Sequence, residues 1–205
     1  RVVETWGVSA DMVSVVYNGL EIEEWKPAIN QMEKTIVTAG RLVPWKGIDV
    51  LIDLLVEVPS WKLVVLGDGP DMQKLVAQAA DLGVSDQVVF KGSVSRGEVM
   101  ECCSAASLFV LNTHFESFSF QIVEAMMVGA RIVTTNIGSI PELIDSGKEG
   151  LLFEPDDKRA ILEVIKQFPV EKSMWELRSE AAIVKAKRFS VEQTVIDTYA
   201  CIDAL

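Results

Sequence analysis

The stretch TIVTAGRLVPWKGIDVLIDLL, residues 35–55, places a short apolar run, a glycine and a helix-length segment in succession. Residues Thr35 to Ala39 are rich in β-branched side chains, which favours a strand. Beyond the glycine, apolar residues recur at three- and four-residue spacing, as on one face of a helix: Ile48, Leu51, Ile52 and Leu55. The stretch therefore predicts a strand that turns sharply into a helix.

The same succession recurs along the whole chain. Six more short apolar runs predict strands: Val13 to Tyr17, Lys62 to Leu66, Val88 to Lys91, Leu108 to Asn112, Arg131 to Thr135 and Gly150 to Phe153. Strands that are buried on both faces are continuous apolar runs, and here helix-length segments separate them. The pattern predicts an α/β fold, a Rossmann-like parallel sheet with helices on both faces. Such sheets bind ligands beyond the carboxyl ends of their strands.

Composition excludes several classes of protein. The 205 residues suit one well-filled core, and a formal net charge of -11 argues against nucleic acid as a partner. No apolar run approaches the roughly 20 residues that span a bilayer, and the start does not resemble a signal peptide. The three cysteines, Cys102, Cys103 and Cys201, have no His or Cys partners at metal-ligand spacing. We therefore expect reduced thiols, no metal and a cytoplasmic location.

The loop from Gly40 to Gly47 carries two cations where a predicted strand ends. Gly40 lets the backbone turn, and the amides at the start of the following helix favour anions. Arg41 can bind phosphate oxygens through two donors, and Lys46 can act as a mobile point charge. Together they could bind a diphosphate and neutralise it as a leaving group. The alternative is a solvated arginine and a lysine at a helix start.

The segment from Glu116 to Glu124 follows another predicted strand. If a helix starts near Phe118, Glu116 lies in the preceding loop and Glu124 faces the cleft about two turns in. Carboxylates accept hydrogen bonds from vicinal hydroxyls, so Glu116 could hold a sugar and Glu124 a ribose. Backbone N–H groups of Phe118, Ser119 and Phe120 would face a phosphate between them. The alternative is a helix-start acid and a solvated helix residue.

In this order and spacing the motifs resemble the family 4, or group 1, glycosyltransferases. The resemblance rests on VVYNG at 15–19, GR at 40–41, KG at 46–47, GDGP at 67–70, FKG at 90–92, the segment 116–126 and GSIPE at 138–142. It covers nearly everything from about residue 13 to residue 168. Ser119 and Ser139 depart from the pattern, because family members often carry glycine at these two positions.

The resemblance implies a GT-B enzyme, in which two Rossmann-like domains face a cleft, and this chain resembles the second, donor-binding half. It implies that Arg41 and Lys46 contact the diphosphate, Glu116 the transferred sugar and Glu124 the ribose, with Arg41, Lys46 and Glu116 as catalytic residues. The base pocket would be lined by a further loop: Lys91, Ser93 and Val94. It also implies hexosyl transfer with retention at the anomeric carbon from a UDP-, GDP- or ADP-hexose, without metal or other cofactor.

The predicted organisation has three parts. Residues 1–28 would hold the remnant of an interdomain linker and the first strand, and residues 29–168 the nucleotide-sugar-binding domain. Residues 169–205 would form helices that pack toward an N-terminal domain outside this chain. That domain would hold the acceptor and any peripheral contact with a membrane. We expect this chain alone to be inactive.

Other functions are compatible with parts of this pattern. A non-catalytic nucleotide-sugar-binding module or a GT-B-like epimerase could share the architecture, because a fold does not fix a function. A nicotinamide dehydrogenase is disfavoured, since Met72 stands where the third glycine of the dinucleotide fingerprint would follow Gly67 and Gly69. The single histidine, His114, has no partner at catalytic spacing, and we interpret it as a loop residue beside the site.

Overall fold

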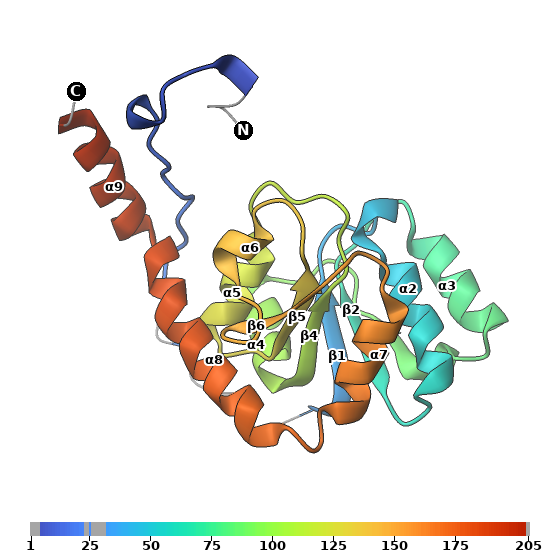
Figure 1. Cartoon of the computed structure of the whole chain (residues 1–205). Helices are drawn as coiled ribbons and strands as arrows, with labels where there is room; N and C mark the ends of the chain where they lie inside the picture. The colour runs from blue at the N-terminus through green and yellow to red at the C-terminus, as the bar shows by residue number, and fades with distance from the viewer. Residues whose placement is uncertain (1–4, 23–24, 26–31, 204–205) are drawn as a thin grey trace.

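The computed structural model describes residues 5–22, 25 and 32–203 and is shown in Figure 1. Among these residues six strands form one sheet in the order β3-β2-β1-β4-β5-β6, and every pairing is parallel. The strands are β1 Met32–Ala39, β2 Lys62–Leu66, β3 Val88–Phe90, β4 Ala106–Leu111, β5 Ile132–Thr135 and β6 Gly150–Phe153. The predicted α/β fold with a Rossmann-like parallel sheet is confirmed.

Helices cover both faces of the sheet (Figure 1). The α-helices of the described residues are α2 Ile48–Leu54, α3 Met72–Asp81, α4 Arg96–Ala105, α5 Phe120–Met127, α6 Ile140–Leu143, α7 Lys158–Gln167, α8 Lys172–Ala186 and α9 Val191–Asp203, of which α9 lies away from the sheet. Short 3-10 helices occur at Ala10–Met12, Pro44–Lys46, Leu55–Glu57, Ser85–Gln87 and Lys187–Phe189. The helix predicted from the opening stretch is α2, which begins directly after Gly47.

Alternate residues of the central strands point into two separate hydrophobic cores. In β4, Phe109 and Leu111 belong to the core beneath α4, α5 and α8, whereas Leu108 and Val110 belong to the core beneath α2, α3 and α7. All four side chains are at most 1% exposed. Burial of such a side chain stabilises a fold by about 1.5–3 kcal/mol. The continuous apolar run of β4 is therefore the sequence signal of a strand covered on both faces.

The predicted strand at Val13 to Tyr17 is wrong. This segment is extended but belongs to no strand, and it lies beside α9, away from the sheet (Figure 1). The Tyr17 carbonyl accepts a hydrogen bond from Thr194 Oγ1 at 2.9 Å, and the Tyr17 and Phe189 rings meet edge to face at 5.4 Å. An apolar β-branched run is typical of any extended segment, so the pattern alone could not separate this one from a sheet strand. The predicted boundary at residues 28 and 29 lies outside the described residues.

The last two helices differ in how they are covered. In α8, Trp175, Ala182 and Ala186 are buried against the rest of the protein. In α9 no residue is buried, and the helix extends away from the sheet (Figure 1). Its exposed apolar side chains are Val191, Val195, Ile196, Tyr199 and Ile202. Both helices were predicted beyond residue 169, and the structure shows them there.

Among the described residues, no helix has the length and apolar character of a membrane-spanning segment.

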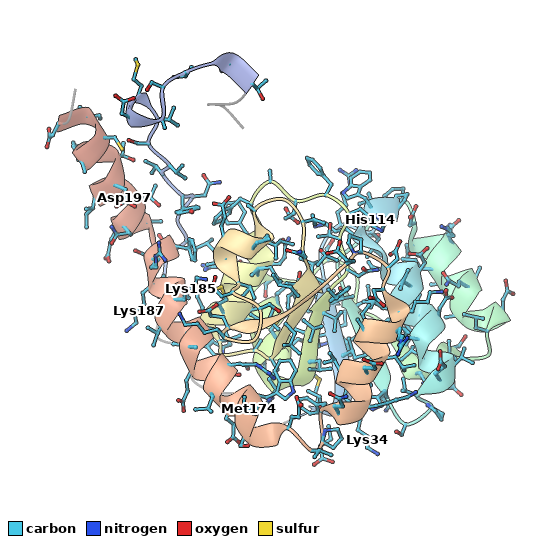
Figure 2. All side chains as sticks on the ribbon, viewed as in Figure 1. Lys34, His114, Met174, Lys185, Lys187 and Asp197 are labelled. Atoms are coloured by element: carbon cyan, nitrogen blue, oxygen red, sulfur yellow. The ribbon has the colours of Figure 1, made fainter. Side chains whose placement is uncertain are left out.

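The strands direct their carboxyl ends to one end of the molecule. Figure 2 labels Lys34, in the first half of β1, at one end, and His114, in the loop after β4, at the other. The loops predicted to carry chemistry follow β1 and β4 and so lie at the end where His114 is found.

Candidate functional site

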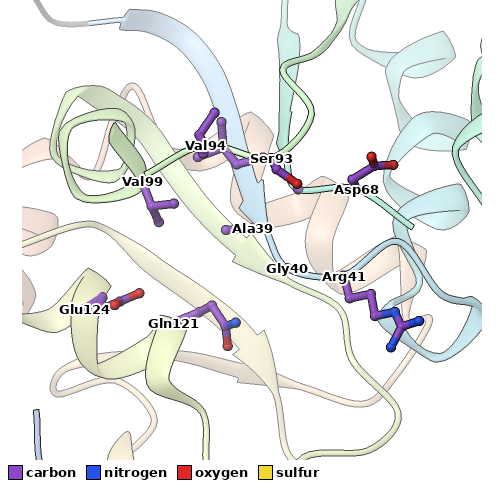
Figure 3. A pocket seen from close by; sticks show the side chains of 11 residues that line it. Ala39, Gly40, Arg41, Asp68, Ser93, Val94, Val99, Gln121 and Glu124 are labelled. Atoms are coloured by element: carbon purple, nitrogen blue, oxygen red, sulfur yellow. The ribbon is translucent and has the colours of Figure 1, made fainter. Parts of the chain in front are cut away.

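A cavity of about 300 Å³ lies at the carboxyl ends of β1 and β2, between these ends and the first turns of α4 and α5. It is lined by Ala39, Gly40, Arg41, Leu66, Gly67, Asp68, Ser93, Val94, Val99, Gln121 and Glu124. Figure 3 shows Glu124 and Gln121 on one side and Arg41 on the opposite side. Its size falls in the range of small-molecule sites. The structure thus brings five of the predicted residues together: Gly40, Arg41, Ser93, Val94 and Glu124.

The floor of this cavity depends on two glycines at adjacent strand ends. The Gly40 N–H donates to the Leu66 carbonyl at 2.9 Å, and the Gly67 N–H donates to the Gly92 carbonyl at 2.8 Å. A Cβ atom on Gly67 would lie 1.9 Å from the carbonyl oxygen of Gly40, and Gly67 has a φ of +132°. A larger residue at Gly67 would therefore force the two loops apart. The GDGP stretch functions here as a turn that lets the backbones approach.

Glu124 lies on the cavity side of α5. The helix begins at Phe120, not near Phe118 as predicted, so Glu124 is about one turn from its start instead of two. The reason is the cap: Ser119 is fully buried, and its side chain accepts the Ile122 N–H at 3.4 Å. Of the three N–H groups predicted to face a phosphate, that of Phe120 alone belongs to the first helical turn.

The carboxylate of Glu124 is 13% exposed and accepts a hydrogen bond from Arg96 Nε at 2.9 Å. Burial raises the pKa of Glu124, while the contact with Arg96 opposes the rise. Arg96 is the first residue of α4. Arg96 is not among the predicted site residues, because a lone arginine at a helix start carries no motif.

Lys46 and Glu116 form an ion pair with 2.8 Å between Nζ and Oε2, and each side chain is 13% exposed. They come from the loops after β1 and β4, which are adjacent parallel strands. Neither residue lines the cavity between Arg41 and Glu124. The structure therefore brings these two predicted residues to one another at the same edge of the sheet.

One buried amide joins the loops around this pair. Asn112 is fully buried, and its Nδ2 donates to the Gly47 carbonyl at 3.0 Å and to Asp156 Oδ1 at 2.9 Å. The Asp156 N–H donates back to Asn112 Oδ1 at 3.0 Å, which holds Asp156 at a φ of +62°. His114 Nε2 lies 2.9 Å from Asp156 Oδ2. Non-glycine residues seldom adopt this φ, so the paired hydrogen bonds account for it.

Asn112 and Asp156 are not among the predicted site residues. In the sequence Asn112 ends a predicted strand, and its pairing with Asp156 joins positions 44 residues apart in the chain. The interpretation of His114 as a loop residue beside the site agrees with its hydrogen bond from N–H to the Trp45 carbonyl at 2.7 Å. That bond links the two loops that carry Lys46 and Glu116.

Lys91, Phe118 and Phe120 do not line the cavity and make other contacts. Lys91 Nζ is 3.9 Å from Cys102 Sγ. The rings of Phe118 and Phe120 meet edge to face at 5.2 Å, and Phe118 also contacts the Phe189 ring at 6.1 Å. Phe118 thus packs against the core, whereas Phe120 is 41% exposed.

Within the described ranges, no group of three or more His, Cys, Asp or Glu residues is placed to hold a metal ion. The predicted absence of a metal from the reaction stays a prediction.

Residues 21–185 match the family described as glycosyl transferases group 1. The chain belongs to this family. The sequence is 30% identical over 198 residues to an exopolysaccharide phosphotransferase of Streptomyces coelicolor, and the match covers 94% of this chain and 21% of the relative. A D-inositol 3-phosphate glycosyltransferase of Acidothermus cellulolyticus is 26% identical over 219 residues, covering 95% of this chain and 48% of the relative.

The fold of this group 1 glycosyltransferase chain matches solved GT-B structures. The crystal structure of HepE from Anabaena in complex with UDP superposes with a TM-score of 0.87 at 24% identity, covering 97% of this chain and 59% of HepE. The C-terminal domain of LpcC, a group 1 family glycosyl transferase of Francisella tularensis, also superposes, with a TM-score of 0.72 at 21% identity, covering 84% of this chain and 100% of that domain. The chain thus has the fold of the C-terminal domain of a GT-B glycosyltransferase. It spans at most about half the length of the two curated relatives named above.

Proposed function

We propose that this chain is the donor-binding domain of a retaining glycosyltransferase that transfers a hexosyl group from a nucleoside diphosphate hexose. The acceptor would be held by an N-terminal domain outside this chain, and the reaction would proceed in the cytoplasm without metal or cofactor. The observation that carries the proposal is the shared cavity of Arg41 and Glu124, a cation and a carboxylate on opposite sides of one site (Figure 3).

The order of these groups fits the order of parts in a nucleotide sugar. Glu124 would accept hydrogen bonds from the ribose hydroxyls, and Arg41 would bind the diphosphate that follows the ribose. Ser93 and Val94, at the cavity wall, would contact the base. Binding of UDP in the crystal structure of HepE supports a nucleoside diphosphate as the ligand.

The ion pair of Lys46 and Glu116 suits the other end of the donor. An ammonium group has three N–H donors, so Lys46 can hold Glu116 and still donate to an oxygen of the diphosphate. The sugar of the donor is bonded to that diphosphate, and Glu116 would accept hydrogen bonds from its hydroxyls. Lys46 and Arg41 would neutralise the charge that develops on the departing nucleoside diphosphate.

Two features support the proposal of an acceptor-binding domain outside this chain. The chain covers 59% of HepE, and α9 carries exposed apolar side chains that suit a further domain. We propose that the interdomain linker and the terminal helices pack toward that domain. Any peripheral contact with a membrane would belong to it.

The test is calorimetric titration of this chain with UDP, GDP, ADP and NAD in EDTA, repeated with Glu124→Ala. Saturable binding of one nucleoside diphosphate, weakened about tenfold or more by the substitution, is expected because a hydrogen bond to a charged group contributes about 1.5–3 kcal/mol. Binding of NAD alone, or a requirement for a divalent cation, would contradict the proposal.

A further inference from the structure

Arg96 makes contacts in two directions from the start of α4. Its Nε donates to Glu124 Oε1 at 2.9 Å, and its Nη2 donates to the main-chain carbonyl of Glu21 at 3.0 Å. The side chain is 36% exposed, whereas that of Glu124 is 13% exposed. One guanidinium thus joins a cavity carboxylate to the segment that precedes the sheet.

The base of this side chain is held firmly. Ser95 caps α4 in a reciprocal box: the Glu98 N–H donates to Ser95 Oγ at 3.3 Å, and the Ser95 N–H donates to Glu98 Oε2 at 3.0 Å. The donors of a guanidinium lie in one plane with fixed directions. The cap fixes the backbone of Arg96, and the bonds from Nε to Glu124 Oε1 and from Nη2 to the Glu21 carbonyl fix the guanidinium plane that faces the carboxylate.

The contact reaches Glu124 from outside the cavity. Glu124 lines the cavity and Arg96 does not. Arg96 bonds Oε1 of Glu124, and among the described residues no hydrogen bond goes to Oε2. Because burial raises the pKa of Glu124 and Arg96 opposes the rise, the arginine also favours the ionised carboxylate, which only accepts hydrogen bonds.

The second contact extends this unit to the C-terminal helix. Next to Glu21, the Leu20 N–H donates to the Phe189 carbonyl at 2.8 Å, and the Val191 N–H donates to the Leu20 carbonyl at 3.0 Å. The Glu21 carbonyl therefore belongs to a segment that is fixed to the start of α9. Arg96 is held at both ends, by the cap of α4 and by this segment.

We propose that Arg96 is a positioning residue for the donor ribose, holding the Glu124 carboxylate so that it accepts hydrogen bonds from the ribose hydroxyls. The inference deepens the proposed function and rests on it. Arg96 acts through Glu124 and through no contact of its own with the ligand. Its removal should therefore affect the recognition of hydroxyl groups more than the recognition of the base or the diphosphate.

The experiment compares each nucleoside diphosphate that binds, among UDP, GDP and ADP, with its 2′-deoxy and 3′-deoxy counterparts. Affinities are measured by calorimetry for the unaltered chain, Arg96→Met and Arg96→Lys. The unaltered chain should prefer the ribonucleotide by about tenfold, as expected for hydrogen bonds to a carboxylate. Arg96→Met should lower this preference several-fold and leave the affinity for the deoxy forms nearly unchanged. Arg96→Lys keeps the charge and should restore part of the preference.

Three controls separate positioning from stability. Arg159→Met removes another arginine near a helix start, one that pairs with Glu163 at 3.2 Å and is 89% exposed, and it should leave the preference unchanged. Melting temperatures of all variants report on the fold. In a chain that already carries Glu124→Ala, Arg96→Met should have no further effect on the preference.

Each other outcome overturns the inference. Equal loss of affinity for ribonucleotides and deoxynucleotides in Arg96→Met would show a structural role. A gain of affinity would show that Arg96 competes with the ribose for Glu124. If the unaltered chain binds none of the diphosphates, the proposed function fails and the inference fails with it. Binding without any preference for the ribonucleotide would refute the role of Glu124 and that of Arg96, while leaving diphosphate recognition intact.

Discussion

Two carboxylates eight residues apart, Glu116 and Glu124, each pair with one cation, yet the two regions are built differently. The partner of Glu116 is Lys46, which is as buried as the acid at 13% exposure. The partner of Glu124 is Arg96, which is 36% exposed and also bonded to a main-chain carbonyl. In the first region the cation is itself a proposed ligand group. In the second it stands outside the cavity and orients the acid.

The largest expected effect is on the stability of the fold and comes from Gly47, the residue after Lys46. Gly47 has a φ of +56°, and a Cβ there would lie 2.3 Å from Asn112 Nδ2. Gly47→Ala should therefore destabilise the fold by about 3 kcal/mol, from the left-handed backbone and the overpacking together. Urea denaturation would measure the change.

The matched control for Gly47→Ala is Gly97→Ala in α4. A Cβ on Gly97 would meet no atom within 4 Å, and this glycine has no positive φ. Alanine should be neutral or stabilise the chain by up to about 1 kcal/mol, because glycine is a poor helix residue. Equal destabilisation by both substitutions would show that the Asn112 contact does not hold the Lys46 loop.

These two glycines also show what a sequence can and cannot predict. Continuous apolar runs located the six strands of the described sheet, because a strand buried on both faces leaves a local signal in the sequence. Gly47 belongs to the KG motif at 46–47 that the sequence shows. The reason that a glycine is needed there is the close contact with Asn112, 65 residues away, which the sequence does not show. The Asp156 and Arg96 contacts are likewise tertiary, and no local pattern precedes them. The helix begins at Phe120, two residues after the predicted start, because Ser119 caps it, and the preference of serine for an N-cap does not by itself choose between Ser117 and Ser119.

The second-largest expected effect is on the affinity for the ligand and concerns the region of Lys46 and Glu116. Lys46→Ala should weaken the binding of a nucleoside diphosphate by about 2 kcal/mol, roughly 30-fold, since it removes a charged donor and leaves Glu116 unpaired. The melting temperature should change far less than the affinity. Calorimetry and thermal denaturation would be compared.

Lys62→Ala is the control for the Lys46 substitution. Lys62 is an exposed residue at the first position of β2, at the opposite end of the sheet. Its removal should leave the affinity unchanged. A large loss of stability with little loss of affinity in Lys46→Ala would assign the Lys46 and Glu116 pair to the fold instead of the ligand.

The smallest expected effect is the pH dependence of ligand binding in the region of Glu124 and Arg96. Burial raises the pKa of Glu124, and Arg96 limits the rise. The preference for a ribonucleotide over its 2′-deoxy form needs the ionised acid, so it should fall as the pH decreases through the pKa of Glu124. In Arg96→Met the fall should begin at a higher pH. The ratio of the two affinities cancels the titration of the phosphate, which both ligands share.

A pH-independent preference would contradict this account of Glu124. In that case the hydroxyl groups would be recognised by a group that does not titrate. The same measurement on Arg159→Met should reproduce the profile of the unaltered chain.

The Asn112 amide has a consequence for how such a site can change during evolution. Gly47, Asn112 and Asp156 are far apart in the chain but meet at the Asn112 amide. A substitution of Asn112 would leave the Gly47 carbonyl and the Asp156 N–H without this partner, and a substitution of Asp156 would remove an acceptor of Asn112 Nδ2. A Cβ at Gly47 would lie 2.3 Å from Asn112 Nδ2. Drift at these three positions must be concerted, which makes it slow. Lys91, by contrast, has a weak 3.9 Å contact with Cys102 that many side chains could replace. If the base is contacted next to Lys91, at Ser93 and Val94 as proposed, new nucleobase preferences would arise there by single substitutions, while the loops around Lys46 and Glu116 would be inherited together.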